Sequence, residues 1–317
     1  MRARLRVCLK PAPSRNQPLS LQAKPQQHAV SLYRRRLDRL LLCCTILIAA
    51  PAHSAAPYFD TELSYVHEDN FAHAARASAA LDDDVMLARA SVNWLLPTSA
   101  KGGLLASLAG EYQRYAHWQA LSRAVLSGQL SYRYKPSADF NAPWLEASVS
   151  GALRQFQDSA LRDSGRLGFE AATGSALTDR INLRLAYRFT LDRSWHGSVF
   201  DSEVHRVYGN VDWRSERMTY YATLAWQRGD AVTSTTANVE LGVAGGAKGS
   251  DSALSDERHS RIAYRLDTDR LSATLGFNVA LASRLVLDVS ALYFDADSEI
   301  GAHYRGYRVT AGVLYRF

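Results

Sequence analysis

Apolar and polar residues alternate one by one along most of the chain. In the last segment, every second residue from Tyr307 to Phe317 is apolar or aromatic, whereas Arg308 and Arg316 fall on the opposite side. A period of two is typical of a β-strand whose two faces meet different surroundings. A helical period would place those arginines within an apolar stripe, so the pattern favours strands.

Twelve segments of the chain share this alternation, an even number that suits an up-and-down meander. Several apolar faces end in aromatic residues, as the interfacial girdles of membrane barrels do. The segments span 58–67, 85–96, 103–115, 123–134, 144–155, 165–174, 180–190, 204–214, 219–228, 263–280, 284–294 and 306–317.

The connections between these segments alternate in length. Five are short or turn-like, and most of the others are longer, including 68–84, 155–164, 191–203 and 229–262. Outer-membrane barrels have short turns on the periplasmic side and longer loops outside. The pattern therefore predicts that both ends of the barrel segment lie in the periplasm. The connection at 229–262 is rich in Gly, Ser, Thr and Ala, and we expect it to constrict the lumen or cover its mouth.

These patterns predict an all-β fold, a transmembrane antiparallel up-and-down β-barrel of about 12 strands. A soluble β-sandwich or periplasmic barrel would also alternate, but it would turn its apolar face inward. Charged residues recur midway along the polar faces, the apolar faces end in aromatic residues, and the last strand ends in Phe317. These three features favour the arrangement with the apolar face outward.

The N-terminal segment has the composition of an export signal. Arg34–Arg36 precede an apolar run of eleven residues from Leu40 to Ala50, broken only by Thr45, and small residues follow near Ala55. This order is typical of a cleaved secretory signal peptide, and the run is too short to span a bilayer as a helix. We therefore predict a signal peptide with a long prefix over 1–54 and the outer-membrane barrel over 55–317.

Composition agrees with this division. The chain is 47% hydrophobic with a mean hydropathy of −0.21, which excludes a helical membrane protein and a disordered one. Ten of the 37 basic residues and one of the 31 acidic residues fall in 1–54, which leaves 27 basic and 30 acidic residues in the remainder. All three cysteines also lie in 1–54. We therefore expect no disulfide in the mature chain, and the basic pI of 9.2 does not indicate nucleic-acid binding.

The C-terminal strand carries a resemblance to a known family. Its alternating residues, ending in Tyr315 and Phe317, look like the C-terminal signal of Gram-negative outer-membrane β-barrel proteins. In overall character the chain is similar to porin-like barrels of this group. The resemblance implies an integral outer-membrane location, recognition of Tyr315 and Phe317 by the outer-membrane assembly machinery, and contact with outer-membrane lipids and lipopolysaccharide.

If the apolar faces meet lipid, the polar faces line a lumen that is rich in arginine. Fixed guanidinium groups bind carboxylate or phosphate and lower the barrier for anions in a narrow pore. The candidate lumen and selectivity residues are Arg89, Arg123, Arg133, Arg154, Arg166, Arg184, Arg188, Arg206, Arg270, Arg308, Arg316, Glu111, Glu146 and Glu170, with further acids at Asp60, Glu62, Asp212 and Asp288.

The lumen pattern predicts a passive channel for small anionic solutes, and in this respect the chain resembles twelve-stranded porins for acidic sugars. One alternative is a closed barrel, structural or adhesive, in which arginines and acids pair and fill the lumen. Another is a hydrolase at the outer rim, acting on lipid or peptide. Its general base would come from the outer histidines, such as His67 and His205, together with Asp82–Asp84.

The enzyme hypothesis is the weaker one, because no serine lies in a nucleophile motif and no histidine pair has metal-ligand spacing. The run Gly242–Ser250 lacks the glycine spacing of a phosphate-binding loop. We therefore predict no catalytic residue, no metal site and no cofactor, and we expect no nucleic-acid partner.

Overall fold

The computed structural model describes residues 56–74, 80–236 and 261–317, and the predicted signal peptide lies outside these ranges. The described residues form twelve β-strands and three short 3-10 turns. The strands are β1 (Tyr58–Glu68), β2 (Asp83–Ser99), β3 (Gly102–Tyr115), β4 (Arg123–Tyr134), β5 (Trp144–Phe156), β6 (Ser164–Ala176), β7 (Ile181–Ser194), β8 (Ser202–Arg214), β9 (Met218–Thr236), β10 (Arg261–Ala282), β11 (Leu285–Ser298) and β12 (His303–Arg316), and the turns are η2 (Gln119–Leu121), η3 (Ala160–Arg162) and η4 (Ser198–Phe200).

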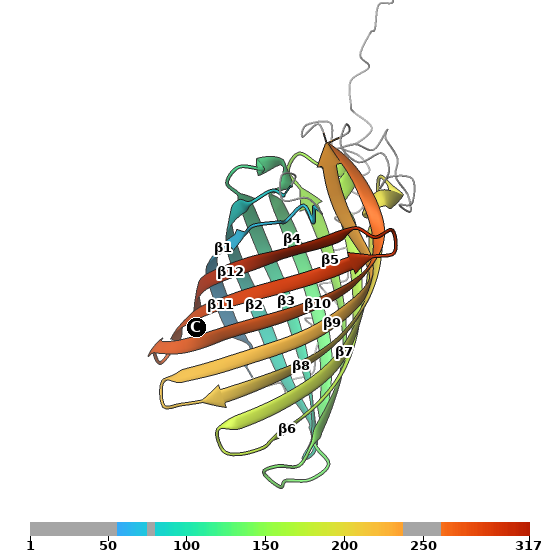
Figure 1. The fold of residues 1–317 in the computed structure, drawn as a ribbon. Coiled ribbons are helices and arrows are strands. Elements are labelled where there is room, and N and C mark those ends of the chain that lie inside the picture. Colours follow the sequence, from blue (N-terminus) through green and yellow to red (C-terminus); the bar gives the residue numbers. More distant parts are fainter. Residues whose placement is uncertain (1–55, 75–79, 237–260) are drawn as a thin grey trace, which may run out of the picture. The chain divides into compact units, whose positions relative to one another are not determined.

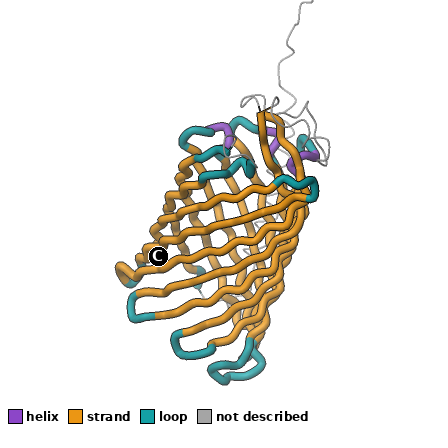
Figure 2. The backbone as a smooth tube through the Cα atoms, in the orientation of Figure 1, coloured by secondary structure: helices purple, strands orange, loops and turns teal. Residues whose placement is uncertain are grey.

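The twelve strands form one closed antiparallel barrel (Figures 1 and 2). Each strand pairs with its neighbours in the sequence, and β12 pairs back onto β1 over nine residues, from Asp60 opposite Arg316 to Glu68 opposite Arg308. The predicted fold class and strand number are confirmed. Among the described residues, no helix has the length and apolar character that a membrane-spanning helix requires.

The outer surface of the barrel is apolar. Paired residues share a face of the sheet, so the pair of Leu63 with Ala88 and the pair of Tyr65 with Met86 continue one apolar row from β1 to β2. Many large apolar side chains of the strands are exposed, for example Leu63 at 56% and Leu275 at 66%. An apolar surface of this extent would be unfavourable in water. This inverted arrangement, with apolar residues outside and charged residues inside, is the one that a membrane barrel needs.

The two ends of the barrel differ. At one end, here called the turn end, β2–β3, β6–β7, β8–β9 and β10–β11 are joined by two to four residues. The β4–β5 connection at the same end is longer, at nine residues. The opposite end, here called the loop end, carries the fourteen-residue connection from β1 to β2 and the three 3-10 turns. At this end β9 and β10 extend beyond the neighbouring strands (Figure 1).

The structure corrects the predicted connection at 229–262. Residues 229–236 belong to β9, and Arg261 and Ile262 belong to β10, so the paired strands continue well into the predicted connection. Arg261 pairs with Thr236 at the tip of the ladder. The central part, 237–260, lies outside the described residues. The alternation was interrupted in this region by small and polar residues, which obscured the strand period.

Candidate functional site

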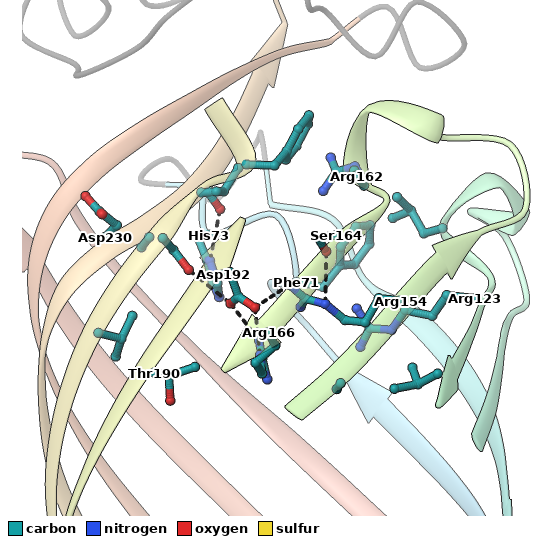
Figure 3. Close-up of a pocket in the computed structure, with 18 of the residues that line it drawn as sticks. Phe71, His73, Arg123, Arg154, Arg162, Ser164, Arg166, Thr190, Asp192 and Asp230 are labelled. Carbon is teal, nitrogen blue, oxygen red and sulfur yellow. Dashed lines mark hydrogen bonds and ion pairs between the residues drawn. The ribbon is translucent and has the colours of Figure 1, made fainter. Parts of the chain in front are cut away.

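A polar cavity of about 700 Å³ occupies the loop end of the barrel interior, and we call it the loop-end cavity (Figure 3). Inward-facing side chains of the strands form most of its wall, and Phe71 and His73 from the connection between β1 and β2 close part of it. Eight arginines line the cavity against four acidic residues. Its volume lies in the range of small-molecule sites, and its net charge favours anions.

The segment Asp69–Ala74 folds into the mouth of the barrel, and we call it the inward segment. At its start, the backbone N–H of Tyr307 donates to Asp69 Oδ1 at 2.7 Å, and Asn70 Nδ2 donates to the carbonyl of Arg305 at 2.9 Å. Both contacts attach the inward segment to β12. The side chain of Asn70 also exchanges two hydrogen bonds with the backbone of Ala74, which closes a compact turn.

The other side of the inward segment attaches to β9. The carbonyl of Ala72 accepts from the backbone N–H of Ser234 at 3.1 Å and from Thr233 Oγ1 at 3.1 Å. The same hydroxyl is 2.8 Å from the carbonyl of His73. The inward segment therefore crosses from β12 to β9 inside the loop end and narrows the mouth. The same role is predicted for the connection at 229–262, whose central part, 237–260, lies outside the described residues.

His73 anchors the inward segment in a ring cluster. Its imidazole stacks on Tyr304 at a centroid distance of 5.2 Å and meets Phe294 edge-on at 5.9 Å. The backbone at His73 has φ of 52°, a left-handed conformation that non-glycine residues adopt at a cost. Removal from water, together with the positive charge of Arg270, lowers the pKa of His73 to about 4. His73 is therefore neutral at pH 7.

Many lumen arginines are neutralised by carboxylates. Asp192, almost fully buried, accepts from Arg154 at 2.6 Å and from Arg166 at 2.8 and 2.9 Å. Ser202 donates to the same carboxylate at 3.1 Å. These bonds hold β5, β6, β7 and β8 together across the cavity wall, because charge-assisted bonds with good geometry are the strong ones. Figure 3 shows Arg154, Arg166 and Asp192 pointing toward one another.

A second ion-pair network lies nearer the turn end. Glu146 accepts from Arg133 at 2.6 and 2.8 Å and from Arg184 at 3.2 Å. Glu170 accepts from Arg184 at 2.5 Å and from Arg188 at 2.6 Å. Two acids therefore compensate three arginines, and the network extends over β4, β5, β6 and β7.

Two further ion pairs of the predicted lumen arginines join β12 to β1. Arg308 donates to Glu68 at 2.8 Å, and Arg316 donates to Asp60 at 2.8 Å. Seven of the eleven predicted lumen arginines are thus paired with carboxylates. Arg89 makes no ion pair among the described residues, but the strand register places it between Glu62 and Glu111.

Three lumen arginines have neither a carboxylate partner among the described residues nor an acidic cross-strand neighbour. They are Arg123, Arg206 and Arg270, and all three line the loop-end cavity. Each guanidinium instead packs on an aromatic ring, with Cζ to ring-centroid distances of 5.5 Å to Phe156, 5.2 Å to Tyr208 and 3.9 Å to Phe294, respectively. Stacking satisfies the flat face of a guanidinium and leaves its N–H edge for an anion.

The sequence did not identify several residues of the loop-end cavity. Asp192 lies within the predicted connection 191–203, but in the structure it belongs to β7, which extends to Ser194. Arg162, Phe71 and His73 lie in connections, and the position of a connection depends on contacts far away in the sequence. In the sequence, the signal for a polar lumen was the excess of arginine over acidic residues on the polar faces of the predicted strands. Glu111, a predicted lumen residue, lines it and accepts from Gln113 at 2.5 Å.

Four of the described histidines pair with acids at the loop-end rim. These contacts are His67 with Asp84 at 2.9 Å, His117 with Asp83 at 3.1 Å, His205 with Glu203 at 3.7 Å, and His303 with Asp297 at 2.9 Å and Asp295 at 3.7 Å. His73 and His196 also lie at this end, and His259 lies outside the described residues.

The His67–Asp84 pair has the geometry of a general base, but a nucleophile is absent from its contacts. Among the described residues, the ring of His67 contacts Asp84 and Tyr307, and it contacts no serine or threonine hydroxyl. Asp83 accepts from the backbone N–H groups of His117 and Trp118, so it orders the connection between β3 and β4. These histidine–acid pairs hold residues of the rim together, and this structural role accounts for them.

One group of side chains has the composition of a cation site. Asp295, Asp297 and His303 place three potential ligand atoms within 4.8 Å of one another on the outside of β11 and β12. The ring of His303 lies within ion-pair distance of both carboxylates, so the contacts among these three side chains account for the cluster.

The predicted assembly signal lies at the turn end. The rings of Tyr315 and Phe317 meet edge-on at 4.8 Å, and the backbone N–H of Phe317 donates to the carbonyl of Phe59 at 3.0 Å. Phe317 is 62% exposed, so its ring is available on the barrel surface.

Comparison with known proteins bears on the fold. No protein-family model and no curated protein matches the chain. It is similar to an outer-membrane channel from Pseudomonas putida F1, with 12% identity and a TM-score of 0.53 over 85% of this chain and 100% of the other. It is also similar to the NanC porin, with 11% identity, a TM-score of 0.46, and 81% and 98% of the two chains covered. At 12% identity, the first likeness shows that the chain has the fold of an outer-membrane β-barrel.

Proposed function

We propose that the chain is an integral outer-membrane channel that passes small anionic solutes. The observation that carries this proposal is the set of three lumen arginines, Arg123, Arg206 and Arg270, that no carboxylate among the described residues neutralises. A fixed positive charge in a low-dielectric wall attracts anions and repels cations. The apolar outer surface and the fold support the location, and the structural neighbour from Pseudomonas putida is itself an outer-membrane channel.

The ion pairs divide the predicted selectivity residues into two groups. Arg184 and Arg188, two of the predicted selectivity residues, share Glu170 and stabilise the wall. Their replacement would change both charge and stability. The uncompensated arginines are better targets, because removing them breaks none of the ion pairs that the described part of the chain contains.

The test is the reversal potential of single channels in a planar bilayer under a KCl gradient. The wild-type protein should show an anion preference, and the triple variant Arg123→Gln/Arg206→Gln/Arg270→Gln should reduce that preference several-fold. The control is Asp60→Asn/Arg316→Gln, which removes one arginine without changing the net charge and should keep the preference. Silence from a folded wild-type barrel would refute the proposal and favour the closed barrel, and cation preference would refute the proposed anion selectivity.

A further inference from the structure

Four polar side chains form one continuous row across the wall of the loop-end cavity. In the strand register, Arg188 on β7 lies opposite Arg206 on β8, Arg206 lies opposite Gln227 on β9, and Gln227 lies opposite Arg270 on β10. Directly paired residues point to the same side of a sheet, and all four line the cavity. The row thus presents three guanidinium groups and one amide to the same space.

The row carries more positive charge than the wall compensates. Glu170 pairs with Arg188, whereas Arg206 and Arg270 have no carboxylate partner among the described residues. The Nε of Arg206 is buried, and none of the described residues accepts a hydrogen bond from it. Like charges directly opposite each other destabilise a sheet, and a buried unsatisfied donor costs free energy as well. An anion bound at the row would relieve the repulsion between the opposed guanidinium groups.

Aromatic rings fix the guanidinium groups in place. The Cζ of Arg270 lies 3.9 Å from the ring centroid of Phe294, and the Cζ of Arg206 lies 5.2 Å from that of Tyr208. Arg184 and Arg188 approach the ring of Tyr208 to 6.0 and 5.7 Å, so three cations surround one tyrosine. Donors held rigid before a ligand arrives lose little entropy when they bind it.

The amide of Gln227 completes the set. It lies between Arg206 and Arg270 in the register, and among the described residues its side chain forms no hydrogen bond. An amide supplies two N–H donors at a position where a fourth arginine would add further repulsion. The row therefore offers donors from three neighbouring strands to one anionic group.

We propose that Arg206, Gln227 and Arg270 form a saturable oxyanion site, which takes the phosphate or carboxylate group of a small solute. The inference rests on the proposed function, since a solute must enter the lumen to reach the row. It goes further, because it assigns retention of the solute at a discrete site. The inward segment lies beside this site through His73, whose ring meets Phe294, the ring under Arg270.

The experiment measures binding in detergent micelles by isothermal titration calorimetry, with inorganic phosphate and acetate as probes and chloride as the competitor. The wild-type barrel should bind phosphate or acetate with a stoichiometry of one. Arg206→Gln and Arg270→Gln should each weaken binding about tenfold or more, and Gln227→Leu should weaken it less. The control variant Asp60→Asn/Arg316→Gln should bind as the wild type does.

Barrel folding is checked for each variant by its circular dichroism and by its heat-modifiable mobility on gels. Binding that does not saturate, or that the Arg206 and Arg270 variants leave unchanged, would overturn the site. The two proposals fail separately. A barrel that binds phosphate but passes no current refutes the channel and retains the site, whereas a barrel that conducts anions without saturable binding refutes the site and retains the channel.

Discussion

Arg188 and Arg206 lie directly opposite each other on β7 and β8, with both side chains facing the loop-end cavity. Glu170 compensates only the first of them, through a contact of 2.5 Å. Opposed like charges are usually eliminated from a sheet because they lower its stability. We attribute their presence to the proposed anion site, whose opposed charges lower the stability of this part of the wall.

Replacement of Glu170 should show how much these opposed charges lower the free energy of unfolding. Glu170→Gln leaves Arg184 and Arg188 without their shared carboxylate while the ring of Tyr208 still holds them near Arg206. We expect a loss of about 1–3 kcal/mol in the free energy of unfolding, because a nearly buried charge-assisted network is broken. Anion preference should rise at the same time.

Urea unfolding in micelles measures the stability of this variant, and the reversal potential measures its selectivity. The matched control is Glu203→Gln at the rim, where the acid is 51% exposed and 3.7 Å from His205. Exposed pairs of this kind contribute little. Equal losses in both variants would contradict the assigned importance of the lumen network.

Acidification should loosen the inward segment through His73. Because the pKa of His73 is lowered to about 4, the packed state favours the neutral ring, and the free imidazole titrates near 6.5. The packed state is therefore fully favoured above pH 6.5 and loses stability as the pH falls toward 4. Protonation also places a cation beside Arg270 and Arg308, and Glu68 is the one carboxylate among the described residues that opposes it.

We expect single-channel conductance to rise between pH 6.5 and 4, as the inward segment leaves the mouth more often. His73→Phe keeps an aromatic ring in the cluster with Phe294 and Tyr304 but cannot be protonated, so its conductance should vary much less with pH. His303→Phe, on the outer surface, serves as the control and should behave as the wild type. A pH response that persists in His73→Phe would assign the effect to other groups.

Gly229 is required where β9 passes β8. Its φ is +134°, and an added Cβ would clash with the carbonyl oxygen of Glu203. Gly229→Ala should therefore cost about 1–3 kcal/mol of unfolding free energy, since both backbone strain and a steric clash oppose it. Denaturant titration in micelles checks this prediction. Gly110→Ala is the matched control, because its Cβ would meet nothing within 4 Å, and equal stability of the two variants would contradict the assigned strain.

The sequence predicted the barrel well for a physical reason. Lipid on one side and a polar lumen on the other force a strict alternation in every strand, so the segment at 123–134 matches β4 at both ends. The interior pairs could not be predicted in the same way. Asp192 reaches Arg154, which lies 38 residues away, and this pairing depends on the stagger of three strands.

The inward segment shows the same limit more strongly. His73 contacts the carbonyl of Val232, a residue 159 positions away, and short polar connections carry no period that would indicate such a partner. The excess of arginine in the lumen was visible in the sequence. Which arginines remain uncompensated was not, because that depends on which acids the register brings within reach.

The seam between β1 and β12 has a consequence for how the barrel is made. Neighbouring strands elsewhere are joined by a connection, but the bond from Arg316 to Asp60 spans 256 residues of chain. Closing so long a loop carries the largest entropic cost of any ladder, so it belongs at the end of assembly. Until then the sheet has two open edges, each able to pair with another chain. The barrel therefore closes only when β12 pairs with β1. We expect a chain that lacks β12 to form an open sheet that is prone to aggregation, and not a narrower pore.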